Sequence, residues 1–382
     1  MHGESNSIII CSVGDLMICD SPLYASVGVG SKYQAIKDKI YSNCKPVFDE
    51  ADIVIGNFET VVHTPKDRSL RETQMCCPES VIGDLKDAGF SVLNLANNHC
   101  MQHGTEGFES TQKTCVKYGI KPIGIKDESP YIVDKNGVKL AFLSLCIHLE
   151  WYEPEHILYE DQIERIISSV KEIRDKEADT VIVVSVHWGD EFAAYPSNAQ
   201  IALAHKLVDC GANVLLGHHS HVFQGIEEYN NGLIVYGQGN YISDMIPLIC
   251  RQTGIVKIKI YGSDDLKTEY ELIPYGIKKD YIPVSASGNW IEERQKSLEE
   301  ALNGKRSDDD YWRDISINHS KAHADFKNYF KANISKYKPA ISIKMIWDFL
   351  GRKLKRVIGT TTDGRVSSMD PVIYDILSGT ET

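Results

Sequence analysis

A cluster of three histidines within four positions is the part of the sequence best suited to chemistry. His218, His219 and His221 follow the apolar residues Leu215 and Leu216. Side chains alternate along an extended chain, so His219 and His221 project to the same side and one short loop can present both to a metal. Neutral imidazole is the commonest metal ligand among side chains. The cluster therefore predicts a metal site, with a histidine-rich surface loop as the alternative.

Four other apolar runs are also followed directly by polar residues of types that bind metals. The runs 8–13, 51–55, 91–95 and 180–186 are followed by the segments Gly14-Asp15, Gly56-Asn57-Phe58-Glu59, Ala96-Asn97-Asn98-His99 and His187-Trp188-Gly189-Asp190-Glu191. Apolar strands that alternate with helical patterns belong to sheets covered on both faces, and ligands collect beyond the carboxyl ends of such strands. We therefore expect the five polar segments to meet in space.

The elements between these segments are predicted from periodicity and caps. Helical patterns cover residues 33–48, 105–118, 161–176 and 201–209, and strands are expected at 138–147, 233–236, 254–260 and 270–273. Ser197 and Gln200 have the spacing of a capping box at the start of the fourth helix. The alternation predicts an α/β (α+β) fold as far as about residue 275.

Composition narrows the class of protein. The chain has 382 residues, of which 42% are hydrophobic, and a formal net charge of −12, which argues against nucleic acid as a partner. No apolar run approaches the roughly 20 residues that span a bilayer, and the first residues lack the pattern of a signal peptide. The ten cysteines are scattered without CxxC spacing, which favours reduced thiols and a cytoplasmic location.

Residues from 288 onward have a different character, so we expect one domain over 1–287 and a helical extension over 288–382. Helical patterns cover 290–302 and 322–337, and Asp308 to Asp310 suggest a solvated break between them. A final helix, 343–358, carries an apolar stripe with basic residues beside it. It could lie on an anionic membrane surface at the inner face of the membrane or dock on a membrane-bound synthase. Packing on the chain's own core or in a homo-oligomer is the favoured alternative.

The ligand types together indicate a reaction. Carboxylates and imidazoles in one pocket suit Zn, Mn or Fe, and a shared carboxylate can hold two ions about 3.5–4 Å apart. Two such ions activate water and stabilise a displacement at phosphorus. Asn98 is a plausible neutral ligand, and His99 could protonate a leaving group. Each residue alone has an ordinary alternative, since Asp15 could cap a helix, Glu59 could be a solvated loop charge and His99 a core histidine.

The order of these segments resembles that of the CapA family of poly-γ-glutamate and capsule biosynthesis proteins. The resemblance covers about residues 8–275 and rests on six short motifs, the five polar segments above and Gly239-Asn240-Tyr241, together with Pro196, Gln200 and Gln224. That family resembles the calcineurin-like metallophosphoesterases. The resemblance therefore implies a four-layer αββα sandwich of two mixed sheets with helices outside, and two divalent metal ions as cofactors.

The resemblance also implies roles for single residues. Asp15 and His221 would bind a first metal, Glu59 would bridge, Asn98, His187 and His219 would bind a second metal, and His99 would be the catalytic histidine. Residues expected to surround these ligands or to face the substrate are Asn57, Asn97, Glu191 and Asn240, and His218 is an additional imidazole without an assigned role.

The sequence departs from the patterns of these families at several positions. Met17 stands where metallophosphoesterases have a histidine ligand, so the first metal site is expected to lack one ligand and to be weaker or vacant. Gln102 stands where CapA proteins usually have an aspartate, and His103 is a candidate to compensate. Ser220 and Gln238 replace a proline and a leucine. Many CapA proteins are also membrane-anchored, whereas no anchor is evident in this sequence.

The expected function is a metal-dependent hydrolase or transferase that acts on a polymer or phosphoester substrate in the biosynthesis of an anionic surface polymer. A generic dimetal phosphodiesterase or nucleotidase is the enzymatic alternative. A non-catalytic binding or scaffold subunit of a polymer-assembly complex is the alternative from a different class. Met17 and Gln102 favour the scaffold, whereas retention of the six predicted metal ligands favours catalysis.

Overall fold

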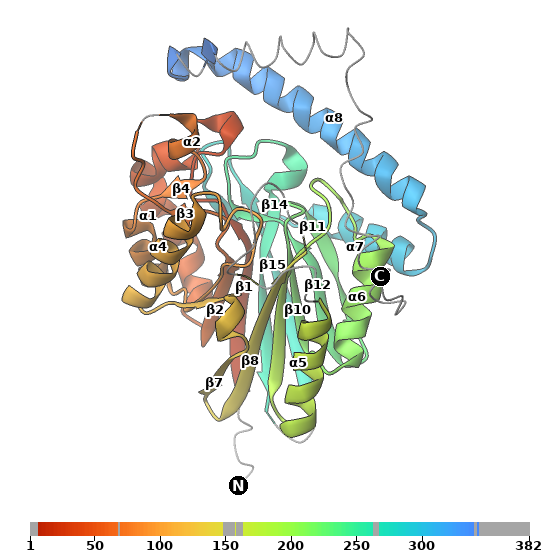
Figure 1. Ribbon diagram of the computed structural model, residues 1–382. Helices are drawn as coiled ribbons and strands as arrows, with labels where there is room; N and C mark the ends of the chain where they lie inside the picture. Colours follow the sequence, from red (N-terminus) through yellow and green to blue (C-terminus); the bar gives the residue numbers. More distant parts are fainter. Residues whose placement is uncertain are drawn as a thin grey trace.

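The computed structural model describes residues 7–67, 69–147, 157, 163–262, 267–339 and 342–343. Two β-sheets form the centre of the molecule (Figure 1). The larger sheet has the strand order β16-β15-β14-β1-β2-β5-β6, with β13 paired to β1. Its strands are β1 (Ser7–Leu16), β2 (Ile53–Asn57), β5 (Val92–Asn94), β6 (Lys121–Ile123), β13 (Asn240–Ile242), β14 (Gln252–Tyr261), β15 (Lys267–Ile277) and β16 (Pro283–Ser285).

The second sheet has the order β11-β12-β10-β9-β8-β7. Its strands are β7 (Tyr131–Lys135), β8 (Val138–Cys146), β9 (Val181–His187), β10 (Val214–His218), β11 (Phe223–Tyr229) and β12 (Gly232–Gln238). A small third sheet pairs β3 (Val61–Val62) with β4 (Cys76–Cys77). Both large sheets contain parallel and antiparallel pairs, as expected for mixed sheets.

Apolar side chains on both faces of the strands hold the layers together. On β1, Ile8 and Ile10 face the second sheet, whereas Cys11 and Val13 face the helices. This alternation follows from the twofold period of a strand, and the strands are apolar throughout because both faces are covered. The second sheet repeats the pattern on β9. The core therefore consists of one layer between the sheets and one layer outside each sheet.

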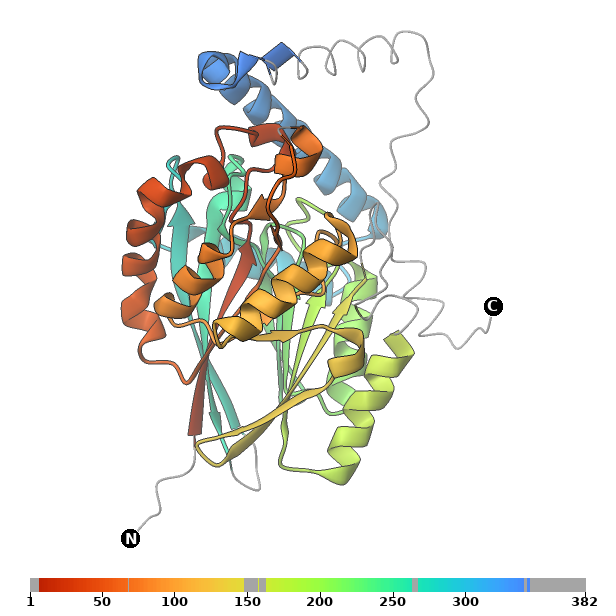
Figure 2. The same cartoon turned by 60° about the vertical axis from the view of Figure 1, so that its left-hand side comes forward.

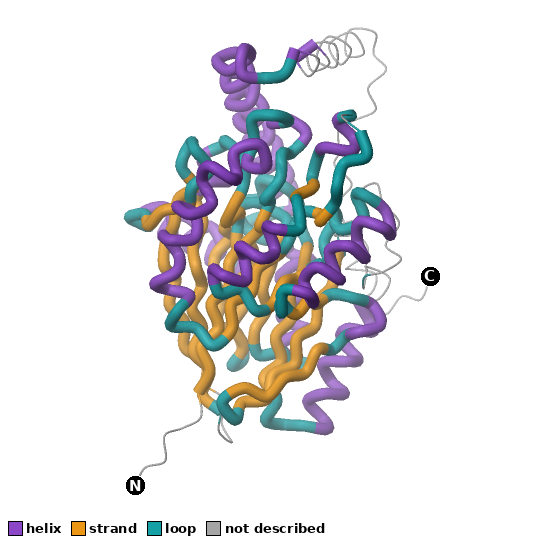
Figure 3. Tube along the Cα trace, turned by 90° about the vertical axis from the view of Figure 1, so that its left-hand side faces the viewer, coloured by secondary structure: helices purple, strands orange, loops and turns teal. Residues whose placement is uncertain are grey.

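Helices cover the two outer faces (Figures 2 and 3). Over the larger sheet lie α1 (Val29–Phe48), α3 (Ser80–Ala88) and α4 (Gly104–Lys117), and over the second sheet lie α5 (Ile163–Lys176) and α6 (Asn198–Asp209). A short helix, α2 (Leu70–Thr73), precedes β4. Ser197 and Gln200 form the predicted capping box of α6. The predicted four-layer αββα class is confirmed.

The helical part after residue 288 differs from the prediction at one point. Ser307 accepts a hydrogen bond from the backbone N–H of Asp310, and the Asp310 side chain accepts one from the N–H of Ser307. The acidic run is therefore the first turn of α8 (Asp308–Asn333), and the predicted solvated break is wrong. Carboxylates are stabilised there because a helix N-terminus carries a partial positive charge.

The other helical segments after residue 288 concern the predicted division into a domain (1–287) and a helical extension (288–382). The helix α7 (Asn289–Leu302) packs on β11, and Trp290 reaches Phe223 in the layer between the sheets, with 5.3 Å between ring centroids. The division at residue 287 stays a prediction. The predicted helix 343–358 lies outside the described residues apart from Ile343. Within the described ranges, no helix is both long and apolar enough to cross a membrane.

Replacement of Leu140 by alanine tests the layer between the sheets. Leu140 on β8 is fully buried there, whereas Ile132 on the neighbouring strand β7 is 46% exposed. We expect Leu140→Ala to lower the free energy of unfolding by about 2–5 kcal/mol, because a cavity remains, and Ile132→Ala by less than about 1 kcal/mol. Urea denaturation followed by circular dichroism measures both changes, and equal losses would contradict this packing.

Candidate metal centre

The five polar segments meet where the two sheets present the carboxyl ends of their parallel strands. β1, β2 and β5 are parallel neighbours in the larger sheet, and β9 and β10 are parallel neighbours in the second. Two groups of ligand atoms result, in each of which all atoms lie within 4.8 Å of one another: Asp15, Glu59 and His221, and Glu59, His187 and His219. The structure thus brings the predicted metal ligands together, with Glu59 shared by both groups.

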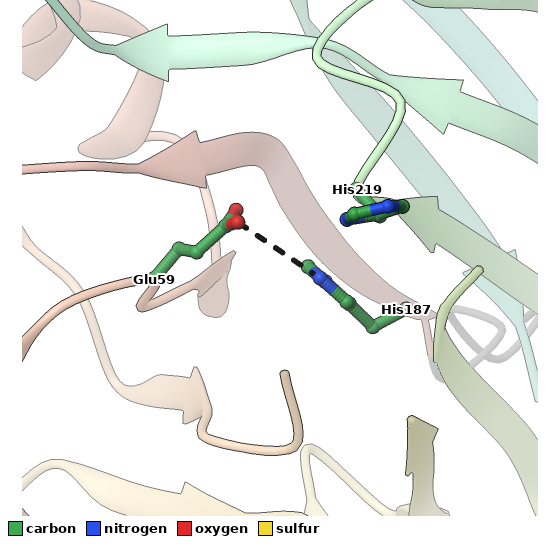
Figure 4. Close-up of side chains that lie close together, drawn as sticks. All are labelled: Glu59, His187 and His219. Carbon is green, nitrogen blue, oxygen red and sulfur yellow. Dashed lines mark ion pairs between the residues drawn. The ribbon is translucent and has the colours of Figure 1, made fainter. Parts of the chain in front are cut away.

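Glu59, from the loop after β2, is the centre of the arrangement. Figure 4 shows its carboxylate facing His187 and His219, which come from the second sheet. Glu59 Oε1 lies 3.9 Å from Nε2 of His187 and 3.9 Å from Nε2 of His221. These separations exceed hydrogen-bond length. They lie within the roughly 3–4.2 Å that separates two donors on one ion with bonds of about 2.0–2.2 Å. The buried carboxylate and imidazoles therefore fit a pair of divalent ions.

Asp15 is fully buried at the end of β1 and is surrounded by donors. Asn57 Nδ2 donates to its Oδ1 at 2.8 Å, and Nδ1 of His218 lies 3.3 Å from the same oxygen. Nδ1 of His221 lies 3.2 Å from Oδ2. Burial would raise the pKa of Asp15, but the two histidines outweigh it and hold that pKa well below its usual range. His218, which had no assigned role, contacts the Asp15 carboxylate.

His221 has its two ring nitrogens in different surroundings. Nδ1 also lies 3.0 Å from Oδ1 of Asn240, so this nitrogen carries the hydrogen and Nε2 faces Glu59. Nε2 also lies 3.8 Å from Oε1 of Glu191. Burial opposes the charged form, but Glu59, Asp15 and Glu191 together raise the pKa of His221 to about 10. The predicted positions of Glu191 and Asn240 beside the metal ligands agree with this geometry.

Asparagines link the ligands on the side of the larger sheet. Asn98 Oδ1 lies 3.0 Å from Nε2 of His187, which places this amide oxygen beside the second ligand group. Asn57 Nδ2 lies 3.2 Å from Oε2 of Glu59, and its Oδ1 accepts a hydrogen bond from Nδ2 of Asn97 at 3.3 Å. Asn57 therefore contacts the ligands Asp15 and Glu59 directly, and Asn97 holds Asn57 in place.

His99 stands at the edge of the centre and is held by a residue of its own loop. Its Nδ1 lies 2.7 Å from Oε1 of Gln102, and its Nε2 lies 3.9 Å from Oε1 of Glu59. Because an amide oxygen only accepts, Nδ1 carries a hydrogen, and Nε2 faces the centre. Nε2 of His103 donates to the carbonyl of Gln74 at 2.9 Å. Gln102 itself contacts His99, and compensation by His103 for the missing aspartate stays a prediction.

The backbone around the ligands is strained and tightly packed. His219 and His221 have φ values of +87° and +56°, which non-glycine residues rarely adopt. A Cβ on Gly14 would lie 1.8 Å from the carbonyl oxygen of Gly239, and the N–H of Asp15 donates to that carbonyl at 2.9 Å. Only glycine permits this approach, which places Asp15 next to Asn240 in the register of β1 with β13.

A pocket of about 360 Å³ leads from the surface to the centre. His99, Glu191 and His221 line it together with apolar side chains, including Met17, and with His319 and His323 of α8. These two histidines were not predicted as site residues, and the predicted helix 322–337 left His319 outside. In the structure their spacing of four places them on one face of α8. The pocket gives a substrate access to ligands that are otherwise buried.

The comparisons with known proteins assign the chain to a family. A family model described as "Bacterial capsule synthesis protein PGA_cap" matches residues 9–245. The chain belongs to this family. The capsule biosynthesis protein CapA of Bacillus anthracis is 30% identical over 259 residues, which cover 64% of this chain and 61% of that protein. The chain therefore matches less than two thirds of the length of that relative.

Two further similarities extend the comparison. The PGA biosynthesis protein CapA of Bacillus subtilis is 31% identical over 263 residues, which cover 64% of this chain and 68% of that protein. Among solved structures, a phosphatase of Mycoplasma pneumoniae aligns with a TM-score of 0.44 at 14% identity, over 71% of this chain and 95% of that one. The matched residues of the PGA_cap family contain all six predicted metal ligands and end before α8.

The buried carboxyl group of Asp244 holds Ser21 at one side of the pocket, and it makes the stability of the protein depend on pH. Asp244 accepts hydrogen bonds from the backbone N–H and the hydroxyl of Ser21, at 2.9 and 2.7 Å, and Ser21 lines the pocket. Burial raises the pKa of Asp244 from 3.8 to about 7, although the bonds from Ser21 oppose this. Between these two values the unfolded chain releases a proton that the folded protein retains.

The stability contributed by Asp244 is therefore fully present below pH 3.8 and is lost as the pH rises through about 7. The asparagine of Asp244→Asn does not titrate. We therefore expect the difference in free energy of unfolding, unchanged protein minus Asp244→Asn, to decrease as the pH rises from about 4 to about 7. Urea denaturation of both proteins over this range measures the difference, which a constant value at all pH would contradict.

Proposed function

We propose that this protein is a hydrolase or transferase that uses two divalent metal ions, Mn, Zn or Fe, and acts in the biosynthesis or modification of an anionic surface polymer. The sharing of Glu59 between two ligand groups carries the proposal. Asp15, Glu59 and His221 would hold the first ion, and Glu59, His187, His219 and Asn98 the second. Two carboxylates and three imidazoles form a donor set that suits these ions.

The side chains around the centre can position a substrate and move a proton. When bound, the metal ions supply Lewis acidity that activates water and neutralises charge at phosphorus. His99 presents Nε2 toward the centre, from where the ring in its imidazolium form can give a proton to a leaving oxygen, and Gln102 holds the ring in this orientation through Nδ1. Asp15 and Glu59 are fully buried, and the pocket lined by His221 gives water access to the ligand groups.

The class of substrate is also a proposal. The relatives from Bacillus are named for capsule and PGA biosynthesis, which supports a polymer or a phosphoester intermediate of its assembly as substrate. A generic phosphodiesterase or nucleotidase would use the same geometry. We further propose that the protein is located in the cytoplasm or at the inner face of the membrane. The predicted helix 343–358 would dock on an anionic membrane surface or on a membrane-bound synthase, or would pack in a homo-oligomer.

One observation favours a second function. Met17 is buried, packs with Cys19 and Met75, and lines the pocket. Among the described residues, only Asp15, Glu59 and His221 form the first ligand group. A site with three side-chain ligands holds its ion less firmly than one with four. A scaffold subunit that binds one ion or none is therefore the competing function.

Substitution of His219 separates the two functions. We expect the purified protein to bind two ions per chain and to hydrolyse bis-p-nitrophenyl phosphate with added Mn²⁺ or Zn²⁺. His219→Ala should lower turnover more than about 100-fold. Loss of a residue that only supports a metal ligand typically lowers activity by about 10–100-fold, and loss of the ligand itself should lower it further. The control is His205→Ala, since His205 lies on α6, pairs with Glu227 and belongs to neither ligand group. A metal-free, inert protein that still binds membranes would support the scaffold instead.

Substitution of Gln102 tests the orientation of His99. Gln102→Ala removes the 2.7 Å contact to Nδ1 and leaves the metal ligands in place. We expect kcat to fall by about 10–100-fold with unchanged metal content, and Gln102→Asp to restore activity because a carboxylate also accepts from Nδ1. Gln112→Ala on α4 is the control. An unchanged kcat in Gln102→Ala would contradict the role given to His99.

A further inference from the structure

Helix α8 crosses above the ends of the strands that carry the metal centre (Figures 1 and 2). Near its start, the hydroxyl of Tyr311 donates to Oδ2 of Asp190 at 3.0 Å, in the loop after β9. Near its end, Phe326 and Tyr329 pack edge-on against Tyr24, with centroid distances of 5.7 and 5.5 Å. The helix is therefore fixed to loops of both sheets, on opposite sides of the pocket.

One stripe of this helix faces the pocket. His319, Ala322, His323 and Phe326 line it together with residues of the metal centre. Their spacing of three, one and three places them on a single face of the helix. His319 is fixed further by Phe192, against whose ring it packs edge-on at 4.7 Å, and the preceding Asn318 donates to the carbonyl of Phe192 at 3.1 Å.

The part of the pocket beside α8, which we call the pocket wall, has a different composition from the metal centre. Leu23, Tyr24, Phe192 and Phe326 make most of the outer pocket apolar, and His319 and His323 add hydrogen-bond donors. Among the described residues that line the pocket, Glu191 is the only carboxylate, and it lies beside His221. Imidazole donates to an oxyanion through N–H, so two imidazoles one helical turn apart suit a carboxylate or a phosphate.

We propose that His319 and His323 form a second, anion-binding subsite that positions the substrate through a charged group remote from the reacting bond. The inference rests on the proposed function, because the metal centre would hold the reacting group. The substrate would then carry two anionic groups joined by an apolar spacer that lies along Leu23, Tyr24 and Phe326. Because α8 lies outside the residues matched by the family model, this subsite belongs to the extension of this chain.

The first test measures binding without relying on turnover. The imidazole signals of the ¹⁵N-histidine-labelled protein are assigned with His319→Ala and His323→Ala, then titrated with inorganic phosphate and, separately, with triglutamate. We expect both signals to shift saturably with at least one probe. Isothermal titration calorimetry should show that the double variant binds that probe about tenfold more weakly. Asn328→Ala, an exposed residue on the opposite face of α8, is the matched control.

The second test uses kinetics of the metal-loaded protein. For a chromogenic phosphodiester that carries an additional carboxylate or phosphate, the double variant should raise KM about tenfold and change kcat by less than about twofold. A phosphodiester without the second charge should show no difference in KM. Equal changes for both substrates would show that the variant disturbs the pocket generally, which would overturn the subsite.

The outcomes separate this inference from the proposed function. Histidine signals that stay unchanged with both probes, or a double variant that binds as the unchanged protein does, would overturn the subsite even if metal-dependent turnover is present. If the protein binds no metal and hydrolyses nothing, the proposed function fails, and the titration still decides whether His319 and His323 bind anions. Shifts with phosphate alone or with triglutamate alone identify the anionic group.

Discussion

The metal centre depends on one shared carboxylate, because Glu59 belongs to both ligand groups and joins residues of the two sheets. It follows β2 in the larger sheet, yet its oxygen faces imidazoles that the second sheet supplies from the ends of β9 and β10. A buried carboxylate is unfavourable unless cations or donors surround it. The two sheets can therefore place Glu59 only where their parallel strands end together, and the layer between the sheets fixes that alignment.

The same constraint explains the features that lower stability locally. Histidines in left-handed backbone conformations, a glycine in contact with a carbonyl oxygen and the buried carboxylate of Asp15 all gather at this edge. None of them improves packing, and each is unfavourable in an ordinary core. Such conflicts concentrate at functional sites, where the surrounding structure compensates for them. Here the alternating apolar faces of the strands and the helices outside them supply that stability.

Much of this arrangement can be predicted from local patterns, and the rest cannot. Apolar runs that end in Asp15, Glu59, Asn98 and His187 indicate parallel strands, and because ligands gather at strand ends, these residues are expected to lie together. The contact of Gln102 with His99 depends on a rotamer in a short loop, and the wall formed by His319 and His323 depends on a crossing far along the chain. The acidic run at the start of α8 is ambiguous in the sequence because three aspartates suit a solvated loop and a helix N-terminus equally well.

The residues matched by the family contain the candidate metal centre, and α8, which follows them, contributes His319 and His323 to the lining of the pocket. The proposed reaction presupposes two metal ions, held by the two ligand groups that share Glu59. Anomalous diffraction from crystals grown with Mn²⁺ tests this most directly. Two peaks about 3.5–4 Å apart, one near Asp15 and His221 and one near His187 and His219, are predicted. A single peak, or none at these ligands, would contradict the account.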